Sequence, residues 1–497
     1  MDEVVKLFRH AAVYGVGQII GKVVAFLLIP LFTYYLSRSD FGTMEMLNQA
    51  STLIGMALGL GVANAVMRFY YSATDDHERR VLVSTGMVFG AVVGALILIS
   101  CWVEAPLFAK TLLGTPGGAT LIRLAAATLL FTFCADIGWT YLQTTQRSVL
   151  YVVLSQGFLL LSVGLNIYFV VVRKTAVVGV FWSSMLASGT IAAILLFVTI
   201  RNVGIHFSAV SLKKLLWFGI PLTPAWVAAF VMNFSDRFFL QHFRGLSDVG
   251  TYAVGYKFGF IVSLLVVQPF IMIWEPKSYE IAAKPNARQV FSRTFTVYSA
   301  LLILLGLCIS VPSREVFEVM LDHKFLFAYQ LVPLIAFAYV AQGIGRFSEA
   351  ALLIRNKTHI LAVIGIVSAM ACLAGNIVLI KFFGMWGGAA STFVTFVLFA
   401  VISYIYGQRH YPIEHDLKTF ATLCLVAVGV LTASLAIPVS WPLWIRIIVK
   451  LALLLAFVCG LPKMGVISSD EFWELRSRIG VGWRRKSVAV GETLEVS

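Results

Sequence analysis

The sequence predicts an all-α, polytopic membrane protein with about fourteen transmembrane helices. Of the 497 residues, 59% are hydrophobic and only 12% are charged, which is about half the charged fraction of an ordinary soluble domain. Apolar stretches of roughly 20 residues, the length that crosses the hydrocarbon core of a bilayer, recur along the chain. These stretches must be helices, because barrel strands would alternate over about 10 residues and unpaired backbone groups are costly in lipid.

Fourteen stretches have this character, with their ends placed to within a few residues. They are 11–36, 41–70, 81–108, 121–143, 151–172, 179–200, 214–241, 250–274, 291–311, 330–354, 359–380, 385–407, 417–437 and 442–462. The connections are short, and the longest runs for about 18 residues between Pro312 and Tyr329. No catalytic domain is expected in such loops, so the sequence predicts a protein that is not an enzyme.

The net charge of +14 is explained by membrane orientation. With the N-terminus in the cytoplasm, 22 of the 38 Lys and Arg residues fall on the cytoplasmic side and ten fall outside, as the positive-inside rule requires. Both termini are then cytoplasmic in a bacterial inner membrane, and no nucleic-acid partner is needed to explain the charge. The charged segment Met1–His10 precedes a span-length apolar run without a cleavage site, so no cleavable signal peptide is expected.

Cysteine and histidine give no sign of metal or cofactor binding. All six cysteines fall within predicted spans at irregular spacing, and the eight histidines lie in loops or at span ends. Irregular cysteines in apolar segments are typical of small packing residues. We therefore expect no disulfide framework, no metal site and no cofactor.

An internal repeat divides the chain. The motif Ser39–Thr43 (SDFGT) returns 208 residues later as Ser247–Thr251 (SDVGT), and we expect Asp40 and Asp248 to act as helix N-caps. Six spans separate the copies, so the repeat is parallel, with an axis along the membrane normal. The predicted parts are a six-helix lobe at 1–210, a second at 211–410, two further helices at 411–462 and a basic amphipathic tail at 463–497 that lies on the cytoplasmic side.

Ionisable side chains inside predicted spans are the main candidates for a functional site, because each is costly in lipid. Four spans carry an amide one turn before a cation, and the eighth span carries a lysine between two glycines. The cations are Lys22, Arg68, Arg237, Lys257 and Arg346, and the supporting amides are Gln18, Asn64, Asn233 and Gln342. This pattern predicts a cavity lined with positive charge, suited to a phosphate or pyrophosphate.

Other interpretations of these charges stay open. Arg68 and Lys450 lie near span ends, where long cationic side chains reach the membrane surface, and Glu349 is placed to neutralise Arg346 three residues away. Asp136 and Asp236 are candidate carriers of a coupling H⁺ or Na⁺, although the membrane potential acting on an anionic substrate is an alternative energy source. Pro221 and Pro224 are expected to bend or break the seventh span.

The chain also resembles a known family. The residues on which the resemblance rests are Tyr14-Gly15, Phe26–Thr33, Tyr35–Ser37 with Phe41-Gly42, Trp274–Pro276, Gly375-Asn376, Phe383-Gly384 and Gly387–Thr392. Together they are similar to polysaccharide transporters of the multidrug/oligosaccharidyl-lipid/polysaccharide flippase superfamily. The resemblance covers roughly residues 8–407.

The resemblance implies two six-helix lobes and alternating access, in a fold like that of the multidrug exporters and the lipid II flippase of that superfamily. The implied substrate is an undecaprenyl-pyrophosphate-linked oligosaccharide, an O-antigen or exopolysaccharide unit, which moves to the periplasmic leaflet and on to a polysaccharide polymerase. A lipid II flippase and a cation-coupled multidrug exporter are the alternatives within the superfamily. A membrane glycosyltransferase or ligase is the alternative from a different class.

Overall fold

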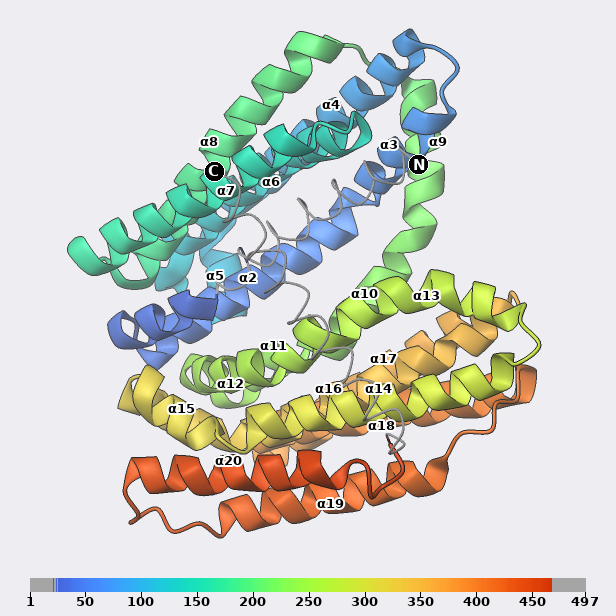
Figure 1. The fold of residues 1–497 in the computed structure, drawn as a ribbon. Helices are drawn as coiled ribbons and strands as arrows, with labels where there is room; N and C mark the ends of the chain where they lie inside the picture. Colours follow the sequence, from blue (N-terminus) through green and yellow to red (C-terminus); the bar gives the residue numbers. More distant parts are fainter. Residues whose placement is uncertain (1–20, 22–23, 25, 467–497) are drawn as a thin grey trace, which may run out of the picture. The chain divides into compact units, whose positions relative to one another are not determined.

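The protein is all-helical in the part that the computed structural model describes, which is residues 21, 24 and 26–466 (Figure 1). Its α-helices are α2 (Arg38–Gly59), α3 (Val62–Ser72), α4 (Asp76–Val103), α5 (Ala105–Leu113), α6 (Ala119–Thr144), α7 (Ser148–Asn166), α8 (Ala176–Val203), α9 (Ala209–Gly219), α10 (Thr223–Phe234), α11 (Asp236–Arg244), α12 (Leu246–Gly259), α13 (Gln268–Ala282), α14 (Ala287–Ser310), α15 (Ser313–Met320), α16 (Val332–Ile354), α17 (Thr358–Phe383), α18 (Met385–His410), α19 (Leu417–Leu435) and α20 (Leu443–Gly460). Short 3₁₀ segments occur at Pro116–Gly118, Ile220–Leu222 and His323–Leu331, and π-helical turns at Ile167–Val172 and Ser263–Val267.

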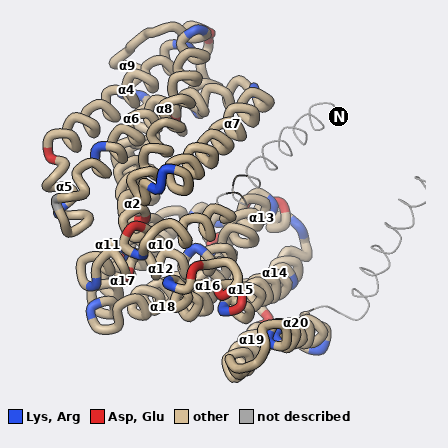
Figure 2. Tube along the Cα trace, turned by 90° about the vertical axis from the view of Figure 1, so that its left-hand side faces the viewer, with Lys and Arg blue, Asp and Glu red and all other residues tan. Residues whose placement is uncertain are grey.

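These helices confirm the predicted class of a multi-pass helical membrane protein. Twelve helical segments of the described part are long and apolar enough to cross a membrane, and the bent pair α2–α3 makes a thirteenth. The remaining predicted span, 11–36, is described only in part, as the short apolar helix Phe26–Tyr35. Figure 2 shows long stretches of chain without charge, with Lys, Arg, Asp and Glu mostly at helix ends and connections.

The chain forms two compact units. The first unit contains Met1–Gly255, Phe317–Leu331 and Gly365–Thr395, and the second contains Tyr256–Val316, Val332–Ile364 and Phe396–Ser497. In the first unit α6 packs against both α4 and α8. In the second unit α14 packs against α16 and α19, and α20 lies beside α19 (Figure 1). The lobe boundaries at 210 and 410 stay predictions, and most of the predicted tail lies outside the described residues.

The first repeat motif begins helix α2, although Asp40 acts differently from the prediction. Ser37 is the N-cap residue, and its hydroxyl accepts a hydrogen bond from the backbone N–H of Asp40 at 3.0 Å. The Asp40 carboxylate in turn accepts from the backbone N–H of Ser37 at 3.1 Å. Asp40 is therefore the third helical residue of a reciprocal capping box, which satisfies two backbone donors at once.

The second predicted span is not continuous. Leu60 and Gly61 both have left-handed backbone conformations, with φ of 47° and 64°, and α2 and α3 meet there at a bend of 41°. Gly61 adopts this conformation without strain because it has no Cβ. Its missing side chain also lets Gly219 and Trp226 approach, since a Cβ on Gly61 would lie 3.0 Å from the Cα of Gly219.

The predicted break in the seventh span is confirmed. Helix α9 ends at Gly219, the 3₁₀ turn Ile220–Leu222 follows, and α10 begins at Thr223. Pro221 lacks the N–H that a continuous helix would use, and Pro224 stands in the first turn of α10, where no N–H partner is needed.

The two copies of the repeat motif pack against each other in a symmetric way. A Cβ on Gly42 would overlap the carbonyl oxygen of Leu246, and a Cβ on Gly250 would overlap the carbonyl oxygen of Arg38. Gly250 and Leu246 follow Gly42 and Arg38 by the same 208 positions. This reciprocal contact is what a two-fold repeat produces at its axis, and it requires glycine on both sides.

Replacing Gly42 with alanine should therefore destabilise the protein by about 1–3 kcal/mol, because the new methyl group overlaps the closely packed backbone at Leu246 and forces it to shift. Gly157 on α7 is the matched control, since a Cβ there meets nothing within 4 Å, and Gly157→Ala should be neutral or slightly stabilising. Denaturant unfolding in detergent micelles measures both variants. Equal stability of Gly42→Ala and Gly157→Ala would contradict the close packing of the repeat.

Candidate functional site

Arg237, a predicted cavity cation, lies in a buried ion cluster in the first unit. Its Nε is 3.1 Å from Oε1 of Glu45, and its Nη1 is 2.8 Å from Oδ1 of Asp236. The Arg237 side chain is 1% exposed. In this structure Arg237 has no surface left for a ligand, so its assignment to substrate binding stays a prediction that requires the cluster to open.

Asp236, a candidate carrier of a coupling ion, is held by the same cluster. Its second oxygen accepts hydrogen bonds from the hydroxyl of Tyr252 and, at 3.4 Å, from that of Thr392. The Arg237 guanidinium also lies 5.2 Å from the ring centroid of Phe234. The cluster thus joins α2, α11, α12 and α18 through two carboxylates and one cation.

Glu45 was missed by the sequence reasoning. It is 1% exposed and lies in α2, within the predicted span 41–70. The sequence does indicate a buried ion pair at this position, because a single carboxylate within an apolar span needs a partner. Gln49, one turn later, donates a hydrogen bond to Oε1 of Glu45 at 2.8 Å, so the two residues form an i, i+4 polar pair on one face of α2.

Arg346, another predicted cation, forms an ion pair but keeps a partly accessible side chain. Its Nη1 is 3.0 Å from Oε2 of Glu349, and the exposed fractions of the two side chains are 44% and 12%. The expected i, i+3 neutralisation by Glu349 is therefore present. The Arg346 guanidinium also lies 5.9 Å from the ring centroid of Phe399, which leaves part of the charged group accessible within an apolar helix.

The remaining predicted residues lie at several places. In the second unit Gln342 is buried and Lys257 is half-buried. In the first unit Arg68 is exposed on α3, with its guanidinium 4.5 Å from the ring centroid of Phe218, and the amide of Asn233 donates to the carbonyl oxygen of Ala229. Lys22 and Gln18 lie outside the described residues. Convergence of all five cations on one cavity stays a prediction.

A cavity in the first unit brings together two other predicted residues, Asn64 and Asp136. Its volume is about 410 Å³, and helices α2, α3, α4, α6 and α10 line it. Asp136, from the middle of α6, is the ionisable residue among the described residues that line it. Among the described residues that line it, this cavity carries one acidic group and no cation, and we call it the acidic cavity. The predicted cationic cavity stays a prediction.

A second buried ion cluster ties α15 to α20 in the second unit. Glu315 is 2.6 Å from Nζ of Lys450 and 3.4 Å from Nη1 of Arg446, and all three side chains are buried. The expectation that Lys450 reaches the membrane surface is wrong, because its ammonium group pairs with Glu315. Sequence reasoning placed Glu315 in a loop, and so it missed the carboxylate that the i, i+4 cations of the last span require.

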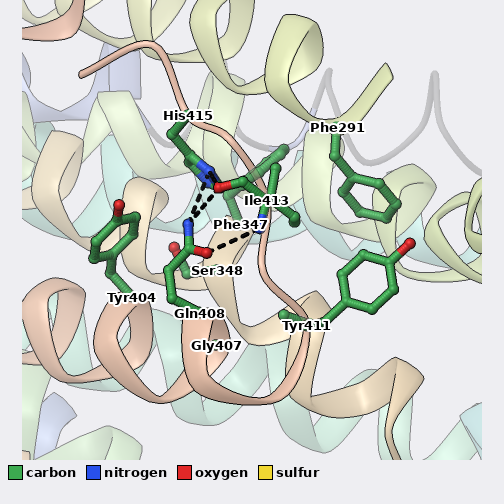
Figure 3. Close-up of a pocket in the computed structure, with 10 residues that line it drawn as sticks. Phe291, Phe347, Ser348, Tyr404, Gly407, Gln408, Tyr411, Ile413 and His415 are labelled. Carbon is green, nitrogen blue, oxygen red and sulfur yellow. Dashed lines mark hydrogen bonds between the residues drawn. The ribbon is translucent and has the colours of Figure 1, made fainter. Parts of the chain in front are cut away.

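The pocket drawn in Figure 3 is too small for a ligand and is lined by aromatic and polar side chains. Gln408 donates to the carbonyl oxygen of Ile413 at 2.7 Å and lies 3.1 Å from Nδ1 of His415. Burial lowers the pKa of His415 and thereby favours the neutral ring. The volume of about 10 Å³ is at most the room of one water molecule, so this group fixes the connection between α18 and α19.

The fold and the buried charges together define a class of protein. Many of the described helices are long and apolar enough to cross a membrane, and several ionisable side chains are paired in buried positions, which is typical of membrane transporters. The chain belongs to the polysaccharide biosynthesis protein family, whose family model matches residues 7–276, more than half of the sequence. The resemblance to the polysaccharide transporter family is thereby confirmed.

One similar sequence is Lsg locus putative protein 1 of Haemophilus influenzae, which is 22% identical over 276 residues. The match covers 52% of this chain and 63% of that protein, so it spans less than two thirds of the relative's length.

Two solved structures are similar in fold. The lipid II flippase MurJ in an inward closed conformation has a TM-score of 0.73 at 12% identity, covering 92% of this chain and 99% of that one. An inward-facing multidrug resistance MATE family transporter of the MOP superfamily has a TM-score of 0.57 at 14% identity, covering 84% of this chain and 99% of that one. At these identities the likeness establishes the fold alone.

Proposed function

We propose that this protein is a flippase that exports an undecaprenyl-pyrophosphate-linked oligosaccharide, an O-antigen or exopolysaccharide unit, across the bacterial inner membrane by alternating access. Membership of the polysaccharide biosynthesis protein family supports the saccharide pathway. The fold supports transport and not catalysis by a glycosyltransferase or ligase. Both termini are proposed to be cytoplasmic, with the saccharide passing to a polysaccharide polymerase outside.

The proposal of an anionic substrate rests mainly on the accessible guanidinium of Arg346. An arginine on an apolar helix is costly unless it has a use, and Arg346 makes one side-chain hydrogen bond, to Glu349, within the described part of the chain. A guanidinium has five N–H donors in a planar arrangement that fits phosphate oxygens. The proposed partner of the remaining donors is the pyrophosphate.

Arg346→Ala should lower the flipping rate of a fluorescent undecaprenyl-pyrophosphate-linked oligosaccharide in proteoliposomes by roughly 10- to 100-fold. Hydrogen bonds to charged groups contribute about 1.5–3 kcal/mol, and each 1.4 kcal/mol is about tenfold. Arg346→Lys should retain an intermediate rate, because it keeps the charge but not the bidentate geometry.

Arg288, exposed on α14, is the matched control for the loss of one positive charge. Arg288→Ala should flip the lipid at the wild-type rate. A folded Arg346→Ala variant with the wild-type rate would remove Arg346 from the proposed substrate site.

Coupling to H⁺ or Na⁺ through Asp136 or Asp236 is part of the proposal. The membrane potential is the alternative driving force, worth about 2.3 kcal/mol per charge per 100 mV. Proteoliposomes with an imposed pH gradient, Na⁺ gradient or potential, each applied alone, separate these sources.

A cation-coupled multidrug exporter is the second candidate function. The observation in its favour is the cavity with the Asp136 carboxylate and the aromatic residues Phe89, Phe133 and Trp226, a combination that can hold an organic cation. Transport of an organic cation such as ethidium, without transport of lipid-linked saccharide, would favour this candidate.

A further inference from the structure

The acidic cavity of the first unit is of a size that suits a ligand. Its volume of about 410 Å³ falls within the roughly 300–1,000 Å³ of small-molecule sites. Its described lining residues run from Thr52 to Trp226, so all of them lie within residues 7–276, the segment that matches the polysaccharide biosynthesis protein family.

Two glycines of α2, Gly55 and Gly59, leave open space in this cavity. A Cβ on Gly55 would meet nothing within 4 Å, and one on Gly59 would meet only a ring carbon of Phe133 at 3.4 Å. Close packing is the rule in protein interiors, so room of this kind beside a bend between α2 and α3 indicates that something else occupies it.

The walls combine flat aromatic faces with a few polar groups. Phe89, Phe133 and Trp226 supply the aromatic side chains, and Thr52, Asn64 and Asp136 supply the polar ones. Neither Asn64 nor Asp136 makes a side-chain hydrogen bond or ion pair within the described residues, and both are exposed to the cavity. Polar groups at membrane depth need a partner, so these two are available to a ligand that enters.

A sugar ring matches this set of groups. A pyranose has an apolar C–H face, which packs on the electron-rich face of an aromatic ring, and a rim of hydroxyl groups. The Asp136 carboxylate accepts hydrogen bonds from hydroxyls, and the Asn64 amide both donates and accepts. An organic cation would use the aromatic faces and the carboxylate but not the Asn64 amide.

We propose that this cavity is a saccharide subsite, which receives a sugar residue of the lipid-linked substrate and selects neutral or amino sugars over acidic ones. The inference rests on the proposed flippase function and specifies its substrate class. The selectivity follows from charge. Asp136 is the ionisable group among the described lining residues, and a uronic acid beside it would place two carboxylates together in a site of low dielectric, which is unfavourable.

The test uses the full-length protein in proteoliposomes and four fluorescent probes. These are undecaprenyl pyrophosphate alone and the same lipid carrying an N-acetylglucosamine disaccharide, a glucosamine disaccharide or a glucuronic acid disaccharide. We expect the wild type to flip the neutral and amino probes at least about tenfold faster than the acidic probe. Asp136→Asn, which keeps the shape and removes the charge, should narrow that ratio to within about threefold.

Gly55→Leu tests the space itself. The new leucine side chain would extend into the open space of the cavity. By occupying that space it should lower the flipping rate of all three saccharide probes at least about tenfold. Binding of undecaprenyl pyrophosphate alone should stay at the wild-type level, which also reports that the variant is folded. Gly157→Leu is the matched control on α7, where a Cβ also meets nothing within 4 Å and the residue does not line this cavity. It should flip every probe like the wild type.

The outcomes separate the two proposals. If the wild type flips no saccharide probe, the flippase function fails and the subsite with it. If the wild type flips them but the acidic probe is as fast as the others, or if Asp136→Asn leaves the ratio unchanged, only the subsite is overturned. Wild-type flipping by a folded Gly55→Leu variant would overturn it as well.

Discussion

Replacing Arg237 with alanine should lower the free energy of unfolding by about 3–5 kcal/mol, which is the usual cost of removing one partner from a buried ion pair. The variant leaves the carboxylates of Glu45 and Asp236 together in a site where all three side chains are almost fully buried. Two carboxylates at that depth without a cation between them repel each other and are poorly solvated. Denaturant unfolding in detergent micelles provides the measurement.

Two comparisons make this expectation specific. Arg79 pairs with Asp76 at 3.0 Å on the surface, with exposed fractions of 38% and 80%, so Arg79→Ala should change stability by less than about 1 kcal/mol. The triple variant Glu45→Gln, Asp236→Asn and Arg237→Met removes all three charges, and it should recover most of the lost stability. An Arg237→Ala protein as stable as Arg79→Ala would show that the cluster does not hold α2 against α11.

Loss of the Glu315 carboxylate should lower the free energy of unfolding by a similar amount, because Glu315 is the shared acidic partner of Arg446 and Lys450. Glu315→Ala leaves Arg446 and Lys450, one turn apart on α20, buried without their shared counter-ion. We expect a destabilisation of about 3–5 kcal/mol, accompanied by faster proteolysis between α19 and α20, because α20 loses the contact that fixes it to α15.

Rescue distinguishes this ionic contact from a general packing defect. Combining Glu315→Leu with Arg446→Met and Lys450→Met replaces the charges with apolar groups, and it should restore stability to within about 1–2 kcal/mol of the wild type. Glu280 is the exposed control, since it pairs with Lys277 and Lys284 at 53% exposure, and Glu280→Ala should be nearly neutral. A failed rescue would mean that shape, and not charge, decides how α20 packs.

The helical class of this protein could be predicted because the constraint is local. A run of roughly 20 apolar residues has one stable form in a bilayer, and Pro221 and Pro224 act on the helix that contains them. The bend at Leu60–Gly61 was not predictable in the same way. It depends on the approach of Gly219, about 160 positions away in the sequence, and nothing in the local pattern of span two requires it.

The same distinction applies to the charged residues. The pair Arg346–Glu349 follows from helical spacing, and the structure contains it. Glu45 and Arg237 are 192 residues apart, so no local pattern connects them, and the ion pair between them could not be predicted. Asp136 and Asn64 were each identified, but only the packing of α3 against α6 brings them into one cavity.

The central claim is tested most directly by the direction and identity of the transported molecule. Purified wild-type protein in proteoliposomes is given a fluorescent undecaprenyl-pyrophosphate-linked disaccharide in one leaflet, and its appearance in the other leaflet is followed by quenching with an impermeant reductant. We predict protein-dependent flipping of this lipid and no accumulation of ethidium. Ethidium transport together with a lipid rate equal to that of protein-free liposomes would contradict the account.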